Sequence, residues 1–414
     1  MYQDTADCQS SRASSNTPAA FRKSCLVISH KRFYFVNGQY CSEGGFGKYV
    51  EVIRSLFDRV YLAVPVEHGP PKGDVGPLRD GVAEVIELPG SYARHRFSIL
   101  GLLHPWRLVR PLARAAKRAD VVHVIFPGYV QIVGLAVARW LRRPHFCSIV
   151  GDWEADYAVS SFARSHALLV RPVIWVHRLL VRWVLQSKLV FVHGATMAER
   201  YRRRGRCIVV NQSSTFREAD IRNSNEVSTL RHMPRLLFVG RLDYKKGVPT
   251  LLDALKKLHE KHLPATLTIV GGGPDRKSFE KQASRLGLQE AVTFEGYVKD
   301  HQRLREIYRA HDLFVLPSLT EGAPKVVIEA YAQGLPVVAS NAGGIPDMVS
   351  EKNGILVEPG DPDALAEAIQ RILHDDTYRL NLARHNLQEA HRYTMEAQVQ
   401  HMTRHLRKCM AESV

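Results

Sequence analysis

The chain has 414 residues, 45% of them hydrophobic, and a formal net charge of +16. This composition fits a globular protein, and the length exceeds one ordinary core, so two or three domains are expected. The basic charge would suit nucleic acid, but the sequence carries no recognition signature for it, so no nucleic-acid partner is expected.

Residues 1–23 are expected to form a disordered leader, because Met1–Ala20 is polar and lacks the apolar core of a signal peptide. The most apolar later run, Ala167–Leu185, contains three arginines and a histidine, so we expect no membrane span. The six cysteines lie far apart, without close pairs or metal-ligand spacing. These features predict a cytoplasmic protein.

Nearly all of the excess positive charge lies in residues 1–233. Residues 1–233 contain 33 Lys and Arg against 18 Asp and Glu, whereas the rest contains 24 against 23. Two stretches without acids, Tyr92–Arg118 and Tyr157–Ala198, hold much of the excess. In the second, the arginines form one stripe on a helix, at positions Arg164, Arg171, Arg178 and Arg182. The stripe fits an anionic membrane surface at the inner face of a membrane, and equally a core helix with a solvated charged face.

Short β-branched runs alternate with longer amphipathic segments from Ser24 onward, which indicates a doubly wound parallel α/β sheet. A polar, irregular stretch then interrupts the alternation, and residues 212–233 are expected to be a linker. The expected strands before it are Cys25–Ser29, Val60–Val64, Val82–Leu88, Val121–Phe126, His145–Ile149, Leu189–Val192 and Ile208–Val210.

The alternation restarts after the linker, which predicts a second Rossmann-like domain over residues 234–388, facing a first domain over 24–211 across a cleft. Residues 389–414 are expected to include a C-terminal helix that packs back on the first domain. The expected strands of the second domain are Arg235–Val239, Thr266–Val270, Val292–Phe294, Leu313–Leu316, Pro336–Ala339 and Gly354–Val357.

A pair of glutamates follows the strand Leu313–Leu316. Glu321 comes before Pro324, which we expect as the first residue of a helix, and Glu329 lies more than one turn inside it. Free amides at a helix start suit phosphate or sugar hydroxyls, and carboxylates can accept two hydrogen bonds from a diol. The competing interpretation is a pair of ordinary helix glutamates.

Cations follow the first strand of the second domain. Arg241 comes directly after Gly240, and Lys246 lies five residues further on. A diphosphate leaving group gains negative charge as the glycosidic bond breaks, and fixed cations stabilise that charge. Arg241 and Lys246 are suited to this without a metal; an ordinary basic turn is the alternative.

Two glycine loops follow strands of the expected sheets. Gly271–Gly273 closes Thr266–Val270, and Gly44–Gly47 follows the first strand. Both allow close approach of a ligand to the backbone, although simple turns would use the same residues.

Taken in order, these motifs resemble the family-four retaining glycosyltransferases of the GT-B fold. The resemblance is strong over the C-terminal domain and thin over the N-terminal one, and the fold it implies is two Rossmann-like domains facing across a cleft. The matching segments are Gly44–Gly47, Val239–Leu242 with Lys246–Gly247, Val270–Pro274, Phe294–Val298, Glu321–Glu329, Gly343–Asp347 and Asn353–Gly354.

The resemblance implies roles residue by residue. Arg241 and Lys246 would hold the donor diphosphate, Glu321 would face the donor sugar, and Glu329 would bind the ribose. The remaining donor contacts would come from Gly272, from Val298 beside the base, from the backbone of Ala323, Pro324, Lys325 and Val326, and from Gly45 and Phe46 across the cleft. Gly343 and Gly344 are expected to be structural.

The family acts with retention, and the favoured account lets the leaving phosphate accept the proton of the acceptor. Relatives often carry a histidine after the strand that matches His145–Val150, but this chain has Gly151-Asp152-Trp153 there. Asp152, His123 or His193 would then contact the sugar or acceptor, while the alternative for each histidine is a hydrogen-bonded residue at a strand end.

Asp361-Pro362-Asp363 has the form of a metal-binding triplet, but it precedes an apolar helix and is expected to be a helix cap. No metal and no cofactor are therefore expected.

These inferences predict a metal-independent, retaining hexosyltransferase that uses a nucleotide-sugar donor and a glycan or lipid-linked acceptor in polysaccharide or glycoconjugate biosynthesis. The alternatives are a nucleotide-sugar epimerase or glycan phosphorylase, which reuse paired Rossmann domains, and a non-catalytic protein that binds nucleotide-sugars or glycans.

Overall fold

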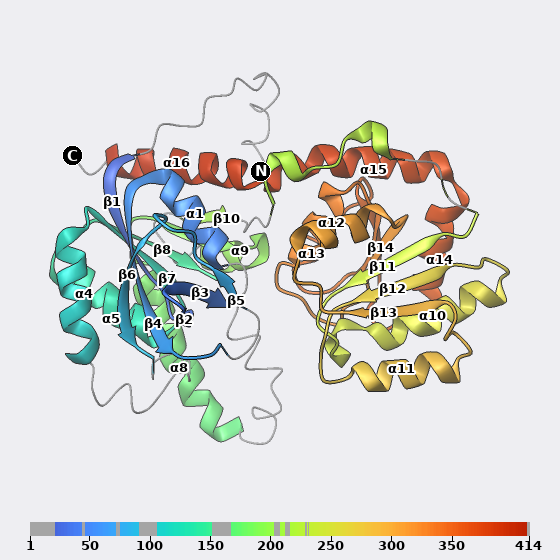
Figure 1. The fold of residues 1–414 in the computed structure, drawn as a ribbon, viewed down its shortest axis with the longest axis horizontal. Coiled ribbons are helices and arrows are strands. Elements are labelled where there is room, and N and C mark those ends of the chain that lie inside the picture. Colours follow the sequence, from blue (N-terminus) through green and yellow to red (C-terminus); the bar gives the residue numbers. More distant parts are fainter. Residues whose placement is uncertain are drawn as a thin grey trace.

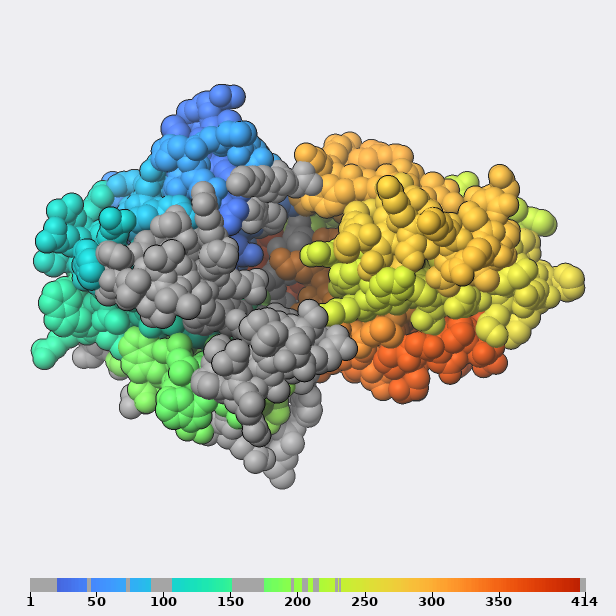
Figure 2. All heavy atoms as spheres, turned by 90° about the horizontal axis from the view of Figure 1, so that it is seen from below, coloured from blue at the N-terminus to red at the C-terminus, as the bar shows by residue number. Residues whose placement is uncertain are grey.

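The computed structural model describes residues 21–43, 46–71, 75–90, 106–150, 167–202, 208–211, 216–227, 230 and 232–411. They form two α/β domains that lie side by side, each built around its own sheet (Figure 1). Figure 2 shows a recess between the two domains. The expected GT-B arrangement is confirmed.

The N-terminal sheet has ten strands in the order β10-β9-β8-β7-β1-β4-β2-β3-β5, with β6 also paired to β4. The strands β1, β4 and β6–β10 run parallel to their neighbours. The strands are β1 (Phe21–Ile28), β2 (Phe33–Val36), β3 (Gln39–Glu43), β4 (Phe57–His68), β5 (Val75–Pro77), β6 (Glu84–Pro89), β7 (Val121–Phe126), β8 (His145–Ile149), β9 (Val190–His193) and β10 (Ile208–Asn211).

Helices cover both faces of this sheet. One apolar cluster packs helices α4, α5, α8 and α9 on one face, and a second packs α1 and the C-terminal helix α16 on the other. The helices of the domain are α1 (Phe46–Leu56), α4 (Trp106–Arg118), α5 (Tyr129–Trp140), α8 (Ala167–Val184) and α9 (Ala195–Arg202). No helix in the described residues is long and apolar enough to span a membrane.

The expected all-parallel N-terminal sheet was wrong in one region, where β2 and β3 form an antiparallel hairpin and β5 pairs with β3. Asn37 and Gly38 connect the hairpin, and both have positive φ angles, 51° and 80°. That conformation is the one an Asn-Gly hairpin turn requires.

The leader expected over residues 1–23 overlaps the first strand. β1 begins at Phe21, whose ring stacks on that of Phe57 with centroids 5.5 Å apart. This contact extends the strand beyond the apolar run on which the prediction was based.

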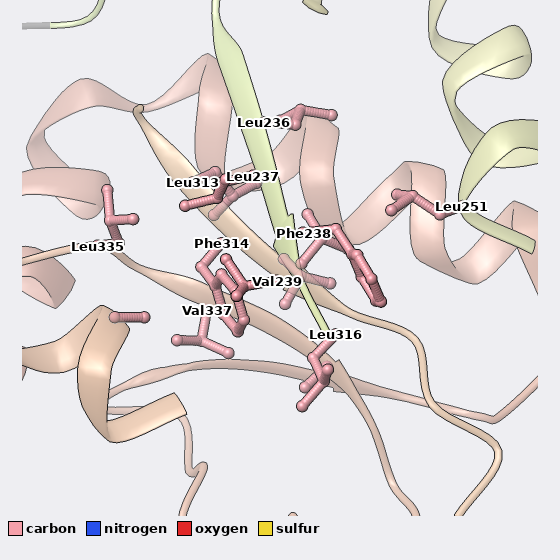
Figure 3. Close-up of a cluster of buried hydrophobic side chains, with 14 of the residues drawn as sticks. Leu236, Leu237, Phe238, Val239, Leu251, Leu313, Phe314, Leu316, Leu335 and Val337 are labelled. Carbon is pink, nitrogen blue, oxygen red and sulfur yellow. The ribbon is translucent and has the colours of Figure 1, made fainter. Parts of the chain in front are cut away.

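The C-terminal sheet has six parallel strands in the order β13-β12-β11-β14-β15-β16. Its core packs both faces of β11 and β14, and Figure 3 shows Leu237, Phe238 and Phe314 at its centre. The strands are β11 (Arg235–Val239), β12 (Thr266–Val270), β13 (Val292–Gly296), β14 (Leu313–Leu316), β15 (Val337–Ser340) and β16 (Gly354–Val357).

The helices of this domain are α10 (Val248–Glu260), α11 (Arg276–Arg285), α12 (His301–Arg309), α13 (Lys325–Ala332), α14 (Pro362–His374) and α15 (Asp376–Ala390). The 3-10 turn His391–Tyr393 then separates α15 from α16 (Met395–Ala411).

Helix α16 leaves the second domain and packs on the first. Its residues Met395, Val399, Met402 and Leu406 join the apolar cluster that contains α1. The start of α16 is tied to the segment after β10, because the amide of Met395 donates to the carbonyl of Phe216 over 3.0 Å. The chain therefore crosses between the domains twice at one place.

Part of the expected linker belongs to the C-terminal domain. Gln333 Nε2 donates to the carbonyl of Asp220 (3.0 Å), and the Arg222 amide donates to that of Ala332 (2.8 Å). Short 3-10 turns at Glu218–Asp220 and Ser224–Glu226 bring these groups to the end of α13.

Candidate functional site

The strand order of the C-terminal sheet sets where a ligand can bind. β11 and β14 are neighbours, and the connections that follow them lead to opposite sides of the sheet, so their carboxyl ends form a topological switch point. In open α/β sheets the ligand crevice lies at this point. The loops after these two strands contain Lys246 and Glu321.

Lys246 and Glu321 meet across the switch point. Lys246 Nζ lies 2.6 Å from Glu321 Oε1, and Ser318 Oγ donates to the same oxygen over 2.8 Å. Their side chains are 24% and 9% exposed, so the ion pair is largely shielded. The arrangement places one fixed cation and one carboxylate side by side.

Glycines hold the two loops close together. Gly247 ends the 3-10 turn of Lys246 with a φ of 68°, and a Cβ there would lie 1.9 Å from the carbonyl oxygen of Pro317. The Leu319 amide also donates to the carbonyl of Lys245 over 2.7 Å. Any side chain at position 247 would separate the loops that carry the ion pair.

Gly343 and Gly344 support the other side of the Glu321 loop. A Cβ on Gly343 would lie 2.0 Å from the Glu321 carbonyl oxygen, and one on Gly344 would lie 1.8 Å from that of Gly322. The amide of Gly344 donates to the Glu321 carbonyl (3.2 Å). The structural role expected for these glycines is confirmed.

At two of its three glycines, the Gly271–Gly273 loop lies against neighbouring protein backbone and not against open space. Cβ atoms on Gly271 and Gly273 would lie 1.9 and 2.2 Å from the carbonyl oxygens of Gly240 and Leu242. Gly272 is different, because a Cβ there would meet only Tyr297, at 3.9 Å. Gly272 therefore keeps the open space that its expected donor contact needs.

Arg241 is on the same loop as Lys246 but stands apart from the ion pair. Its guanidinium is 71% exposed and lies 3.6 Å, from Nε to Oδ2, from Asp243. The expected grouping of Arg241 with Lys246 on one phosphate would require this side chain to turn from Asp243.

Glu329 forms a second polar cluster at the domain interface. Tyr308 donates a hydrogen bond to Glu329 Oε2 over 3.2 Å, and burial together with this carboxylate raises the pKa of the phenol well above its usual value. The phenol therefore stays protonated and remains a donor.

Cations from both domains lie within electrostatic range of Glu329. Burial lowers the pKa of Lys48 in α1 and of Lys325 in α13, while the charge of Glu329 opposes the shift in both. Burial and the charge of Lys325 lower the pKa of His193, at the end of β9, to about 4. Residues of the two domains thus share one electrostatic environment in the cleft.

A cavity of about 30 Å³ lies beside Glu329, room for about one water molecule. Phe216, after β10, is part of its wall, so the cavity lies where the chain passes between the domains. The lining residues are Phe216, His301, Leu304, Arg305, Tyr308, Glu329, Ala332 and Gln333.

The other residues expected to contact the donor lie around the carboxyl ends of the strands of the C-terminal sheet. Val298 is half-buried after β13 and packs on the core. Ala323 is exposed, Pro324 is buried, and Val326 is half-buried. The expected helix start was off by one residue: α13 begins at Lys325, and Pro324 takes the N-cap position with a φ of −72°.

The site residues expected in the N-terminal domain differ in where the structure places them. Gly45 and Asp152 lie outside the described residues. Phe46 begins α1 and packs edge-on against Phe33, with ring centroids 6.1 Å apart. His193 ends β9 at the cleft, as described above.

His123 is not placed to contact a substrate in this structure. It lies in the middle of β7 with no solvent exposure, where its Nε2 is 2.8 Å from Ser148 Oγ and its ring stacks on Phe146. Burial lowers its pKa to about 3. The hydrogen-bonded alternative fits this histidine.

Asp361 has the expected helix-cap role. Its Oδ1 accepts hydrogen bonds from the amides of Asp363 and Ala364, both over 2.9 Å, and Pro362 is the first residue of α14. The described residues contain no group of three or more His, Cys, Asp or Glu side chains arranged to hold a metal.

Three site residues were missed by the sequence-based prediction. Ser318 lies two residues after the end of β14 and could have been found from that position. Lys48 follows the first glycine loop, which is also a usable signal. Tyr308 comes from α12, and no local pattern shows that this helix turns its phenol toward Glu329.

The chain is similar to known glycosyltransferases. Residues 221–392 match the family model of glycosyl transferases group 1. The sulfoquinovosyl transferase SQD2 of Arabidopsis thaliana is 28% identical over 394 residues, which cover 91% of this chain and 71% of that protein. A D-inositol 3-phosphate glycosyltransferase of Corynebacterium urealyticum is 40% identical over 167 residues, only 38% of this chain and 39% of that protein.

Solved structures share the whole fold. A sucrose-phosphate synthase from Thermosynechococcus elongatus superposes with a TM-score of 0.68, at 23% identity, over 94% of this chain and all of that one. Anabaena HepE in complex with UDP and glucose gives a TM-score of 0.67, at 21% identity, over 94% of this chain and all of that one. At these identities the likeness establishes the two-domain GT-B fold.

Proposed function

We propose that this chain, whose residues 221–392 belong to the group 1 glycosyltransferases, moves a hexose or N-acetylhexosamine from a nucleotide diphosphate sugar to a glycan or lipid-linked acceptor. The observation that carries the proposal is the ion pair of Lys246 and Glu321, 2.6 Å apart at the switch point of the C-terminal sheet. This is where an open α/β sheet binds its ligand.

The donor diphosphate is proposed to pair with the charged amine of Lys246. As the glycosidic bond breaks, negative charge grows on the leaving phosphate, and a cation fixed by packed loops stabilises the transition state more than the ground state. Arg241 is exposed beside Asp243 and can turn toward the same phosphate. In HepE, a protein of the same fold, the bound ligands are UDP and glucose.

The two glutamates are proposed to grip the donor at its two ends. Glu321 would accept hydrogen bonds from hydroxyls of the transferred sugar, and Glu329, oriented by Tyr308, would accept those of the ribose. Gly272, with open space at its Cα, and Val298 would lie along the nucleoside. Lys325 at the start of α13 adds a third cation at the cleft.

The reaction is proposed to proceed with retention and without a metal. The leaving phosphate itself accepts the proton of the acceptor hydroxyl, so that no protein base is required. In this account the N-terminal domain binds the acceptor, and the enzyme acts in the cytoplasm at the inner face of a membrane.

Donor consumption measured with and without acceptors tests the proposal. A glycosyltransferase cleaves a nucleotide-sugar much faster when its acceptor is present, and the released nucleotide and the new glycoside appear in equal amounts. Interconversion of two nucleotide-sugars without any acceptor would identify an epimerase instead, and binding without turnover of any donor would contradict the enzyme assignment. A thermal-shift screen with UDP, GDP, ADP and their sugar conjugates identifies the donor to use.

A further inference from the structure

The segment 216–222, between β10 and β11, carries charged groups that connect the two domains. Arg217 Nη2 lies 3.2 Å from Glu51 Oε2 of α1, and the Arg217 amide donates to Asp220 Oδ2 over 2.9 Å. Asp220 Oδ1 in turn lies 3.2 Å from Arg305 Nη1 of α12. Figure 1 shows α1 and α12 on the facing sides of the domains. A chain of polar contacts therefore runs from one domain to the other through this segment.

The acidic members of this chain are partly shielded from solvent. The side chains of Glu51 and Asp220 are 19% and 25% exposed, so their ion pairs are screened less than pairs on an open surface. The backbone of Asp220 is fixed as well, because its carbonyl accepts a hydrogen bond from Gln333 Nε2 of α13 over 3.0 Å. The segment is thus held to the C-terminal domain at Asp220, and its Arg217 side chain reaches α1 of the N-terminal domain.

Lys48 lies on the same side of α1 as Glu51. The two residues are three positions apart in the helix, so their side chains are neighbours on one face. Burial lowers the pKa of Lys48, while the charges of Glu329 and Asp220 oppose that shift. The amine of Lys48 therefore lies within electrostatic range both of the charged chain and of the carboxylate proposed to bind the ribose.

The cavity beside Glu329 borders the same chain of contacts. Arg305 is part of its wall, and so is Phe216, the residue directly before Arg217. Phe216 is buried and joins the core of the C-terminal domain. A displacement of the segment would therefore move a wall of the cavity together with the contact to α1. The surroundings of Glu329 depend on how this segment is held.

We propose that Arg217 and Asp220 are positioning residues for the donor, because they join α1 to α12 and so hold the two walls of the cleft at the spacing that the donor spans. Helix α1 then carries Lys48 to the Glu329 carboxylate before the donor arrives, and a preorganised site loses less free energy on binding. The effect on the donor rests on the proposed function, whereas the effect on the arrangement of the domains does not.

Small-angle X-ray scattering of the full-length protein without ligand tests the arrangement of the domains. Arg217→Gln breaks the contact with α1 but leaves Glu51 paired with Arg79 Nε, 3.4 Å away, so no acid is left without a cation. The radius of gyration of this variant should exceed that of the unchanged protein by about 1 Å, against roughly 22 Å for a compact chain of this length. Arg217→Lys keeps the charge and should restore the smaller value.

Steady-state kinetics with the nucleotide-sugar identified by the thermal-shift screen tests the positioning role. Arg217→Gln should raise the donor KM about three- to fivefold and change kcat by less than about twofold, the size expected for the loss of one partly exposed ion pair. Asp220→Asn should raise the KM to a similar extent. The double variant should be no worse than either single variant, because both residues act through one chain of contacts.

The matched control is Arg118→Gln, which breaks the 2.8 Å ion pair with Glu84 inside the N-terminal domain. The Arg118 side chain is 50% exposed and that of Arg217 is 51% exposed, so the two changes remove a cation from similar surroundings. The control should leave both the radius of gyration and the donor KM unchanged. Unfolding temperatures show whether each variant is folded, and Asp220→Asn replaces Arg217→Gln in the scattering comparison if the latter is not.

Three results would overturn the proposal: an equal rise in KM in the control, additive effects of the Arg217 and Asp220 changes, or an unchanged radius of gyration in the folded variant. A failure of the proposed function looks different, because the unchanged protein would then transfer no sugar. In that case the scattering comparison alone decides whether Arg217 and Asp220 hold the domains in place.

Discussion

The phenol of Tyr308 in α12 donates its hydrogen bond to Oε2 of Glu329 in α13, over 3.2 Å. Tyr308 is almost fully buried and Glu329 borders the cleft, so the contact ties a core residue to the site. It holds Glu329 in one orientation, with its carboxylate directed by a donor that does not titrate near neutral pH.

Tyr308→Phe is therefore expected to raise the KM for the donor about 5- to 10-fold with little change in kcat, because a hydrogen bond to a charged group contributes about 1.5 to 3 kcal/mol and only part of that acts on binding. Tyr331→Phe is the matched control, since its phenol donates to the carbonyl of Met348 over 2.9 Å, away from Glu329. Steady-state kinetics should show the KM effect in the first variant alone. An equal rise in both would mean that loosening α13, and not orienting Glu329, is responsible.

Gly343→Ala is expected to lower both stability and activity. Position 343 has a φ of 57°, and the new Cβ would lie 2.0 Å from the carbonyl oxygen of Glu321, so the loop must move. Gly287→Ala isolates the backbone cost, since Gly287 has a φ of 71° but a Cβ added there would have no neighbour within 4 Å. The control should lose about 1 to 2 kcal/mol of unfolding free energy and keep its activity. Comparable transfer rates in the two variants would show that the Gly343 contact does not position Glu321.

Stability should fall as the pH drops below about 6.5. Burial holds the pKa of His123 at about 3 and that of His193 at about 4, so the unfolded chain binds protons that the folded chain does not. Above the unfolded pKa of about 6.5, these histidines are neutral in both states and do not lower the free energy of unfolding. As the pH falls from there toward the folded pKa values, the free energy of unfolding decreases by up to about 1.4 kcal/mol per pH unit for His123. Unfolding temperatures between pH 7.5 and 4.5 should decline less steeply for His123→Gln than for the exposed control His374→Gln. Identical slopes would contradict this assignment.

Transfer activity should not depend on a divalent metal. Lys246 and Arg241 are proposed to neutralise the charge of the departing diphosphate, so a chelator should change kcat by less than about twofold. The measurement is a transfer assay with excess EDTA, followed by addition of Mg²⁺ or Mn²⁺. Loss of activity with EDTA and recovery with either ion would refute the metal-independent mechanism.

The parallel strands could be predicted closely because they are buried on both faces and consist of short apolar, often β-branched runs. β7, β8, β11, β12, β14 and β16 begin and end at the expected residues. The β2–β3 hairpin was missed although Asn37-Gly38 carries the usual turn signal and β2 is apolar throughout, because β3 is only partly apolar.

The positions of Lys246 and Glu321 in the site could be predicted from the sequence for a similar reason. Lys246 and Glu321 follow neighbouring strands, and strand order brings such positions together. Arg241 follows the same strand as Lys246, but its long side chain lies beside Asp243, a choice of rotamer that no pattern encodes. Tyr308 reaches Glu329 only through the packing of α12 on α13, which depends on the tertiary structure.

The most direct test of the account compares sugar transfer by Lys246→Ala and Lys245→Ala. The two lysines are neighbours on one 3-10 turn, but Lys245 is exposed, whereas Lys246 pairs with Glu321. With the donor and acceptor identified as above, kcat should fall at least about 100-fold for Lys246→Ala, the loss seen when one group that stabilises transition-state charge is removed. Lys245→Ala should stay within about twofold of the unchanged protein. Full activity in folded Lys246→Ala would contradict the central claim that this cation stabilises the departing diphosphate.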